Sequence, residues 1–118
     1  MRENVLKKKS FDFALRIVKM YKYLQDEKKE FIMSKQLMRS GTSVSAMIRE
    51  AEFAESKTDF VHKMAIAQKE INETIYWLEL LTASEYITIQ QFESINLDAV
   101  EIIKLITSSI KTVKNINH

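Results

Sequence analysis

The fold follows from residues 56–81, which read SKTDFVHKMAIAQKEINETIYWLELL. Ser56 and Asp59 have the spacing of a capping box, in which a serine oxygen accepts an amide hydrogen of the first helical turn and a carboxylate reaches back to the helix start. Apolar positions then recur every three or four residues, with one threonine in the series: Phe60, Met64, Ala67, Ile71, Thr74, Leu78 and Leu81. This spacing predicts an amphipathic helix over residues 57–85.

Three other segments have the same spacing. A helix over residues 11–25, with Ser10 as its N-cap, has the series Phe11, Ala14, Val18 and Tyr21, flanked by Ile17 and Leu24. A helix over residues 32–55 has the series Leu37, Gly41, Val44, Ile48 and Ala51. Thr88 and Gln91 repeat the capping box before a helix over residues 89–114, whose series includes Phe92, Ile95, Ala99, Ile102 and Ile106.

The connections between these helices are only a few residues long, and helices joined in this way pack as antiparallel neighbours. We therefore predict an all-α protein: an antiparallel up-down-up-down four-helix bundle that forms a single domain over residues 1–118. The composition agrees, because the 118 residues include no proline and a single glycine, Gly41.

The composition also limits location. The chain has no cysteine, which excludes disulfides and thiol nucleophiles and fits a reducing compartment. The first thirty residues contain no unbroken apolar run, and nowhere do eighteen apolar residues follow one another. We expect a soluble cytoplasmic protein with no signal peptide and no membrane partner.

No constellation for catalysis is evident. Metal sites in helix bundles use paired Glu-x-x-His motifs, so we considered Asp59 with His62 and Glu70 with Glu73. The chain has only two histidines and the second, His118, is its last residue. Phosphate-binding glycine loops and Ser-His-Asp arrangements are also missing from the sequence. We expect no metal, no cofactor, no small-molecule substrate and no enzymatic activity.

Charge is unevenly distributed along the chain, although the net charge is only +2. Residues 1–39 hold eleven Lys or Arg and five acids, whereas residues 70–101 hold seven acids and no base. This asymmetry indicates either a nucleic-acid surface or the packing of oppositely charged helices side by side. The candidate nucleic-acid residues are Lys7, Lys8, Lys9, Arg16, Lys19, Lys22, Lys28 and Lys29.

Counting from the turns predicts charge pairs between helices. Arg39 and Glu73 are both seventeen residues from the turn at Ser56, so an antiparallel hairpin places them at one level. By the same count Arg16 and Glu101 fall near that layer. These residues predict a partly buried charged layer that specifies register; the alternative is solvated charges on outward faces.

Two features point to close packing with another helix. The small residues at positions 40–46, around Gly41, either form a polar ligand groove or let a helix of the same or a neighbouring subunit approach closely. Tyr76, Trp77 and Leu80 make the predicted third helix apolar around most of its circumference, which indicates self-association or, alternatively, a broad core. The candidate subunit-interface residues are Gly41, Tyr76, Trp77 and Leu80.

Taken together, these motifs resemble a known family. The resemblance rests on residues 36–44 (QLMRSGTSV), with Ile48, Glu50-Ala51, Ser56, Asp59-Phe60, Ile66-Ala67, Lys69-Glu70, Glu73 and Tyr76-Trp77-Leu78. They are similar to the small bacterial four-helix bundle proteins encoded within intervening sequences of 23S ribosomal RNA genes. One position departs from the family pattern, because Met47 stands where an asparagine is usual.

The resemblance implies a ring-like homo-oligomer, commonly a pentamer. It also implies a relation to the nucleic-acid-binding accessory protein of diversity-generating retroelements. Two functions are open at this point: an oligomer that binds RNA or DNA through a basic surface, and an oligomeric protein scaffold that binds no nucleic acid.

Overall fold

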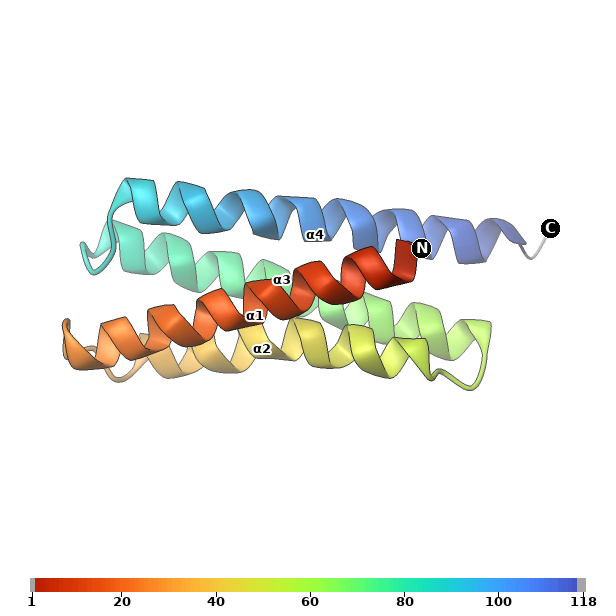
Figure 1. Ribbon diagram of the computed structural model, residues 1–118, viewed down its shortest axis with the longest axis horizontal. Helices are drawn as coiled ribbons and strands as arrows, with labels where there is room; N and C mark the ends of the chain where they lie inside the picture. Colours follow the sequence, from red (N-terminus) through yellow and green to blue (C-terminus); the bar gives the residue numbers. More distant parts are fainter. Residues whose placement is uncertain (1, 117–118) are drawn as a thin grey trace.

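The computed structural model describes residues 2–116, which form helices α1 (Arg2–Asp26), α2 (Met33–Glu52), α3 (Lys57–Ala83) and α4 (Ile89–Ile116). Consecutive helices run in opposite directions along a rod of 51 × 22 × 21 Å (Figure 1). The predicted all-α four-helix bundle is thereby confirmed. The bounds of α2, α3 and α4 lie within three residues of the predicted ones.

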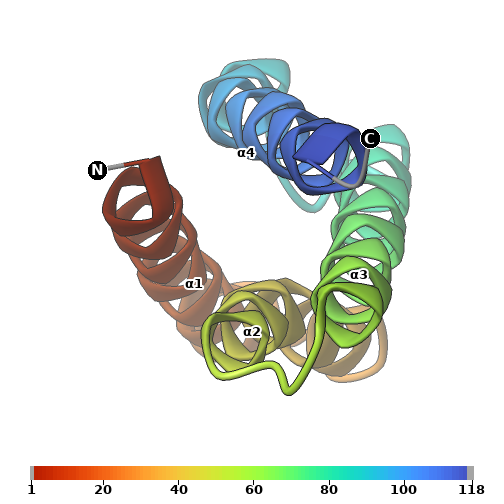
Figure 2. The same ribbon diagram turned by 90° about the vertical axis from the view of Figure 1, so that its right-hand side faces the viewer.

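Each helix packs against two neighbours, in the cyclic order α1, α2, α3, α4 (Figure 2). We call each line of contact between two helices a seam. The α2/α3 seam is the most extensive and the α1/α4 seam the least. In the end-on view the α1 and α4 ribbons stand apart on one side of the ring of helices (Figure 2). The α1/α4 side is therefore the most open side of the bundle.

The predicted stripes of α2, α3 and α4 form most of the core. Their buried apolar side chains are Leu37, Val44, Ile48, Ala51, Met64, Ala67, Ile71, Leu78, Leu81, Ile95, Ala99, Ile102 and Ile106. Phe60 and Phe92, near the starts of α3 and α4, pack partly against this core. Burial of each large apolar side chain stabilises the fold by about 1.5–3 kcal/mol relative to exposure.

α1 differs from its prediction. It begins at Arg2 rather than Phe11, and Ser10 lies buried within the helix, where its hydroxyl donates to the Lys7 carbonyl at 3.1 Å. The predicted N-cap at Ser10 was therefore wrong. The apolar residues that α1 buries are Leu6, Phe13, Ile17 and Leu24, whereas Ala14, Val18 and Tyr21 are half-buried and Phe11 is 47% exposed. The segment holds two apolar series at helical spacing, and packing against α2 selects the one that contains Ile17.

The two predicted capping boxes are present. Ser56 Oγ accepts the Asp59 amide hydrogen at 3.0 Å, and the Asp59 carboxylate reaches back to the Glu55 amide at 3.2 Å. A hydrogen bond from Lys63 and that amide together lower the pKa of Asp59. Thr88 and Gln91 form a reciprocal box, with N···O distances of 2.8 and 3.1 Å. These caps begin α3 and α4 at the positions read from the sequence.

The start of α2 uses a device that the sequence did not suggest. The Glu30 carboxylate, only 7% exposed as a residue, accepts the amide hydrogens of Ile32, Met33 and Ser34 at 3.1, 2.9 and 2.7 Å. Burial by itself raises the pKa of Glu30, but the hydrogen bonds from Met33, Ser34 and Ile32 outweigh it and leave the pKa below its ordinary value. Glu30 is thus a charged cap on the helix, where the dipole favours an anion.

Candidate interaction surfaces

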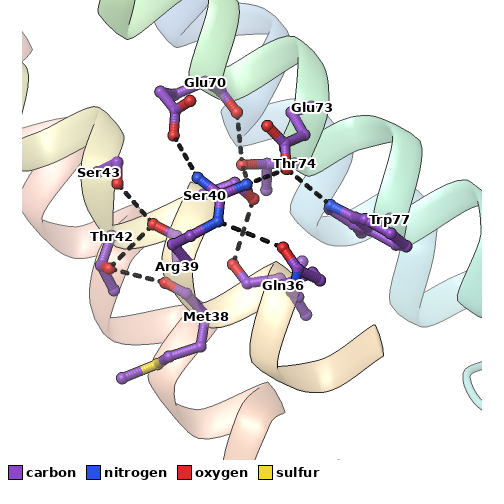
Figure 3. Close-up of polar contacts among 11 residues, drawn as sticks. Gln36, Met38, Arg39, Ser40, Thr42, Ser43, Glu70, Glu73, Thr74 and Trp77 are labelled. Atoms are coloured by element: carbon purple, nitrogen blue, oxygen red, sulfur yellow. Dashed lines mark hydrogen bonds and ion pairs between the residues drawn. The ribbon is translucent and has the colours of Figure 1, made fainter. Parts of the chain in front are cut away.

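Polar side chains gather on the α2/α3 seam around Arg39 (Figure 3). The guanidinium Nη1 lies 3.1 Å from Glu70 Oε2, Nη2 pairs with Glu73, and Nε donates to Gln36 Oε1 at 3.3 Å. The predicted pairing of Arg39 with Glu73 is confirmed. Arg39 joins two acids on consecutive turns of α3, so it fixes how α2 and α3 are aligned.

A second layer lies under this ion pair. Thr74 Oγ1 is 2.9 Å from Ser40 Oγ and 2.8 Å from the Glu70 carbonyl oxygen. Ser40 and Thr74 are both fully buried. Trp77 Nε1 donates to Glu73 at 3.0 Å, so Glu73 accepts from both Arg39 and Trp77. Because these polar groups satisfy one another, the cluster pins two helices together.

The small residues of α2 serve packing within the chain. A Cβ added at Gly41 would lie 2.7 Å from Ile17 Cγ1, so the glycine lets α1 approach α2. Thr42 and Ser43 hydroxyls donate to the carbonyls of Met38 and Arg39 at 2.7 and 2.6 Å. The same-subunit alternative for this segment therefore holds, and Gly41 is buried against α1 rather than presented to a neighbouring subunit.

The aromatic residues of α3 divide into two groups. Tyr76 and Leu80 are 53% and 36% exposed, whereas Trp77 is half-buried and packs against the core. The Tyr76 and Trp77 rings meet edge to face, with centroids 4.9 Å apart. A broad core thus absorbs part of this apolar excess, and Tyr76 and Leu80 remain as an outward apolar pair.

Four of the eight candidate nucleic-acid residues form ion pairs within the chain. Lys7 pairs with Glu52 at 3.1 Å, Lys8 with Asp12 at 3.0 Å, Lys9 with Glu101, and Arg16 with Asp98 at 2.8 Å. The hydrogen bond to Glu101 is the main reason that the pKa of Lys9 is raised. Opposite charges on packed helices therefore account for part of the charge asymmetry.

The count from the turns placed Arg16 and Glu101 near the Arg39 layer, but these two residues do not pair with each other, because Glu101 pairs with Lys9. Arg16 donates instead to the Asp98 carboxylate and to both the carbonyl and hydroxyl oxygens of Ser94. The partner of Arg16 does not follow from the count, because α1 and α4 are not joined by a turn and small register offsets add up over the two intervening helices.

The other four candidates lie near the end of α1 and in the loop that follows. Lys19, Lys22, Lys28 and Lys29 are exposed, and within the described part of the chain none of them has an ion pair. We call these four residues the α1 lysine cluster. It is the part of the predicted basic surface whose charge remains available to a ligand.

Other site types find no support in the described residues. His62 is exposed, and no group of three or more His, Cys, Asp or Glu within residues 2–116 is arranged to hold a metal ion. No helix in this range combines the length and the apolar character needed to cross a bilayer. The second histidine considered for a metal site, His118, lies outside the described residues.

Comparison with known proteins decides the family. The model of the family described as 23S rRNA-intervening sequence protein matches residues 2–108. The chain belongs to this family. A crystal structure of a protein of unknown function from the S23 ribosomal protein family of Bacteroides thetaiotaomicron superposes with a TM-score of 0.93 and 61% identity, covering 94% of this chain and 99% of that one. No curated protein matches.

Membership in the 23S rRNA-intervening sequence family confirms the resemblance drawn from the sequence. Residues that carried it, including Gln36, Arg39, Glu70 and Glu73, meet in the α2/α3 cluster, so in this protein they have a structural role (Figure 3). Met47, at the position where asparagine is usual, packs partly against the core. Neither match names a retroelement protein, so that relation stays a prediction.

Proposed function

We propose that this protein is a non-enzymatic, self-associating helical bundle that binds RNA through the α1 lysine cluster. The observation that carries the proposal is the difference among the eight candidate basic residues: Lys7, Lys8, Lys9 and Arg16 are ion-paired, whereas the cluster is not. Phosphate contacts by lysines release counterions from RNA, so binding is expected to be salt-sensitive and largely independent of sequence.

Self-association would amplify this surface. A ring, the pentamer implied by the resemblance, repeats the cluster on every subunit, and linked weak sites bind a polyanion far more tightly than one site. Tyr76 and Leu80 on α3 support self-association, because they form an exposed apolar pair and tyrosine is enriched among the residues that anchor protein contacts. Gly41 has no part in this contact, since it is buried against α1.

Light scattering on size-exclusion chromatography, combined with fluorescence anisotropy of a labelled single-stranded RNA, tests the proposal. We expect an oligomer that binds RNA at low salt and releases it as salt rises. Replacing Lys28 and Lys29 with Gln should weaken binding about tenfold or more and flatten the salt dependence by roughly one unit of slope per lysine. Replacing Lys7 and Lys8, which are already ion-paired, is the matched control and should have a smaller effect.

The alternative is an oligomeric scaffold for another protein, with no nucleic-acid binding. The ion pairs of Lys9 and Arg16 with α4 favour it, because they give the positive charge of α1 a role in holding the bundle together. An oligomer that shows no RNA binding at low salt would support the scaffold and remove nucleic acid as the partner. A monomer would contradict both functions.

A further inference from the structure

The open α1/α4 seam contains a groove of about 510 Å³ near the end of α1. Its polar wall is formed by Arg16, Lys19 and Tyr23 of α1 and by Gln90, Gln91 and Ser94 of α4. Met20 and Ile95 supply its apolar surface. The volume falls within the range of about 300–1,000 Å³ that is typical of small-molecule sites.

Arg16 is held in place on one side of the groove. Its Nη1 lies 3.2 Å from the Ser94 carbonyl and 2.8 Å from Asp98, and its Nη2 lies 2.9 Å from Ser94 Oγ. A guanidinium has five N–H donors, so these three contacts leave two for a ligand. The α4 contacts therefore fix the guanidinium in advance, which lowers the entropy cost of using its remaining donors.

Donors outnumber acceptors along the groove. Lys19 brings an ammonium that has no ion pair among the described residues, and Gln91 uses its Oε1 to accept the Thr88 amide, which leaves its NH₂ group as a donor. Gln90 is exposed and adds a second amide. None of the residues that line the groove is acidic. The groove is therefore suited to an anion.

The remaining lining residues favour a planar group beside that anion. Tyr23 and Met20 are partly buried and provide a phenol ring and a thioether, which pack well against aromatic rings. Primary amides such as those of Gln90 and Gln91 can hydrogen-bond the edge of a nucleobase. An anion and a planar base with polar edges occur together in a nucleotide.

We propose that the α1/α4 groove binds one nucleotide unit, with its phosphate at Lys19 and Arg16 and its base against Tyr23 and Gln90. The inference rests on the proposed RNA-binding function and assigns to it a defined site. The unit can be one nucleotide of an RNA strand or a free nucleotide, because both present the same phosphate and base. Sequence-tolerant stacking of a base on an aromatic side chain accompanies backbone contacts in many single-strand-binding proteins.

The test is nuclear magnetic resonance of ¹⁵N-labelled full-length protein, titrated separately with AMP, inorganic phosphate, polyglutamate and a short single-stranded RNA. AMP and RNA should shift the amide signals of Tyr23 and Ser94 and the side-chain NH₂ signals of Gln90 and Gln91, and phosphate alone should bind more weakly. Lys19→Gln should weaken AMP binding about tenfold, since one charge-assisted hydrogen bond is lost.

Lys22→Gln is the matched control, because it removes the same charge from another exposed position of α1 that lies outside the groove. It should leave AMP affinity within about twofold of the original and affect only RNA binding, through the salt-dependent charge effect. Gln90→Ala, a second exposed variant, should weaken AMP binding while leaving the weaker binding of phosphate unchanged.

The outcomes separate the site from the function. RNA binding that leaves the groove signals unshifted overturns the site and keeps the proposed function. AMP shifts at the groove without RNA binding support the site as one for a free nucleotide and contradict the RNA function. Equal shifts by polyglutamate and AMP overturn the nucleotide assignment, because a general anion or an acidic peptide then explains the binding.

Discussion

Arginine bridges two seams of this bundle, and the two seams differ in what accompanies it. Arg39 pairs with Glu70 and Glu73 above the buried contact between Ser40 and Thr74, so the α2/α3 seam is closed. Arg16 pairs with Asp98 beside a groove of about 510 Å³ in the α1/α4 seam. Both seams therefore hold a cross-helix ion pair, but among the described residues only the α2/α3 seam has a buried hydroxyl contact beneath it.

The α1/α2 seam is also closed, because Gly41 lets these two helices approach each other closely. We expect Gly41→Val to destabilise the fold by about 3 kcal/mol, because its side chain meets Ile17 atoms only 2.7 and 2.8 Å from the position of the Cβ. Urea denaturation measures the loss. Adding Ile17→Ala to this variant should recover part of it, since the two side chains share one space.

One outcome would show that Gly41 does not serve packing between α1 and α2. If Gly41→Val kept its stability but lost self-association in light scattering, the small residues of α2 would face a neighbouring subunit. The α1/α2 seam could then no longer be counted as a seam closed by packing within one chain.

The helix ends provide a further comparison, because the Glu30 carboxylate caps the start of α2. We expect Glu30→Gln to cost about 2 kcal/mol at pH 7, since an ionised acceptor of three amides is replaced by a neutral one. The folded-state pKa of Glu30 is lowered, so its stabilisation is present above the ordinary carboxyl pKa and lost as pH falls through the folded value.

Denaturation curves at several pH values measure this cap. The difference between the original protein and Glu30→Gln should be full near neutral pH and should shrink below about pH 4. A difference that stayed constant down to pH 2 would mean that the charge of Glu30 does not contribute, and that α2 is held by packing alone.

The two arginines permit a direct comparison. Arg39→Met should cost about 1–2 kcal/mol, because Glu70 and Glu73 are left without their cation in a partly buried seam. Arg16→Met should cost about 0.5 kcal/mol or less, as expected for an exposed pair. Trp77, the only tryptophan of the chain, reports on the first change, since it shares Glu73 with Arg39.

Two measurements distinguish these variants. The emission of Trp77 should change in Arg39→Met and stay the same in Arg16→Met, and urea denaturation should rank the variants in the same order. Equal stability losses would contradict the difference between the seams. An Arg39→Met protein with unchanged stability and oligomeric state would remove the idea that this layer specifies register.

The sequence was sufficient where neighbouring helices are joined by a turn. The Arg39 pairing followed from equal distances to Ser56, because a short hairpin leaves little freedom of register. The partner of Arg16 did not follow, because two other helices set the position of α1 against α4. Periodicity likewise gave the cores of α2, α3 and α4, but α1 offers two apolar series and only packing selects between them.

Neither the groove nor the Glu30 cap could be predicted from the sequence, for a related reason. Lys19 and Gln90 are distant in the chain, and their proximity depends on the register of the α1/α4 seam. Glu30 lies in a charged loop whose sequence has no apolar period, and its inward position depends on the chain turning at Lys29, which has a left-handed φ of 55°. Neither feature has a local pattern that distinguishes it.

The smallest predicted effect tests how α1 starts. Ser10→Ala should leave the free energy of unfolding unchanged or raise it by up to about 0.5 kcal/mol, because alanine is the better residue within a helix and the lost bond to the Lys7 carbonyl is local. If Ser10 were an N-cap, the same change would cost about 1 kcal/mol. Urea denaturation separates a gain from a loss of this size when the two proteins are compared at their midpoints. A loss of stability would place the start of α1 at Phe11 and contradict the helical turns that bring Leu6 to the core. An unchanged or higher free energy of unfolding supports a helix that runs from Arg2 through Ser10.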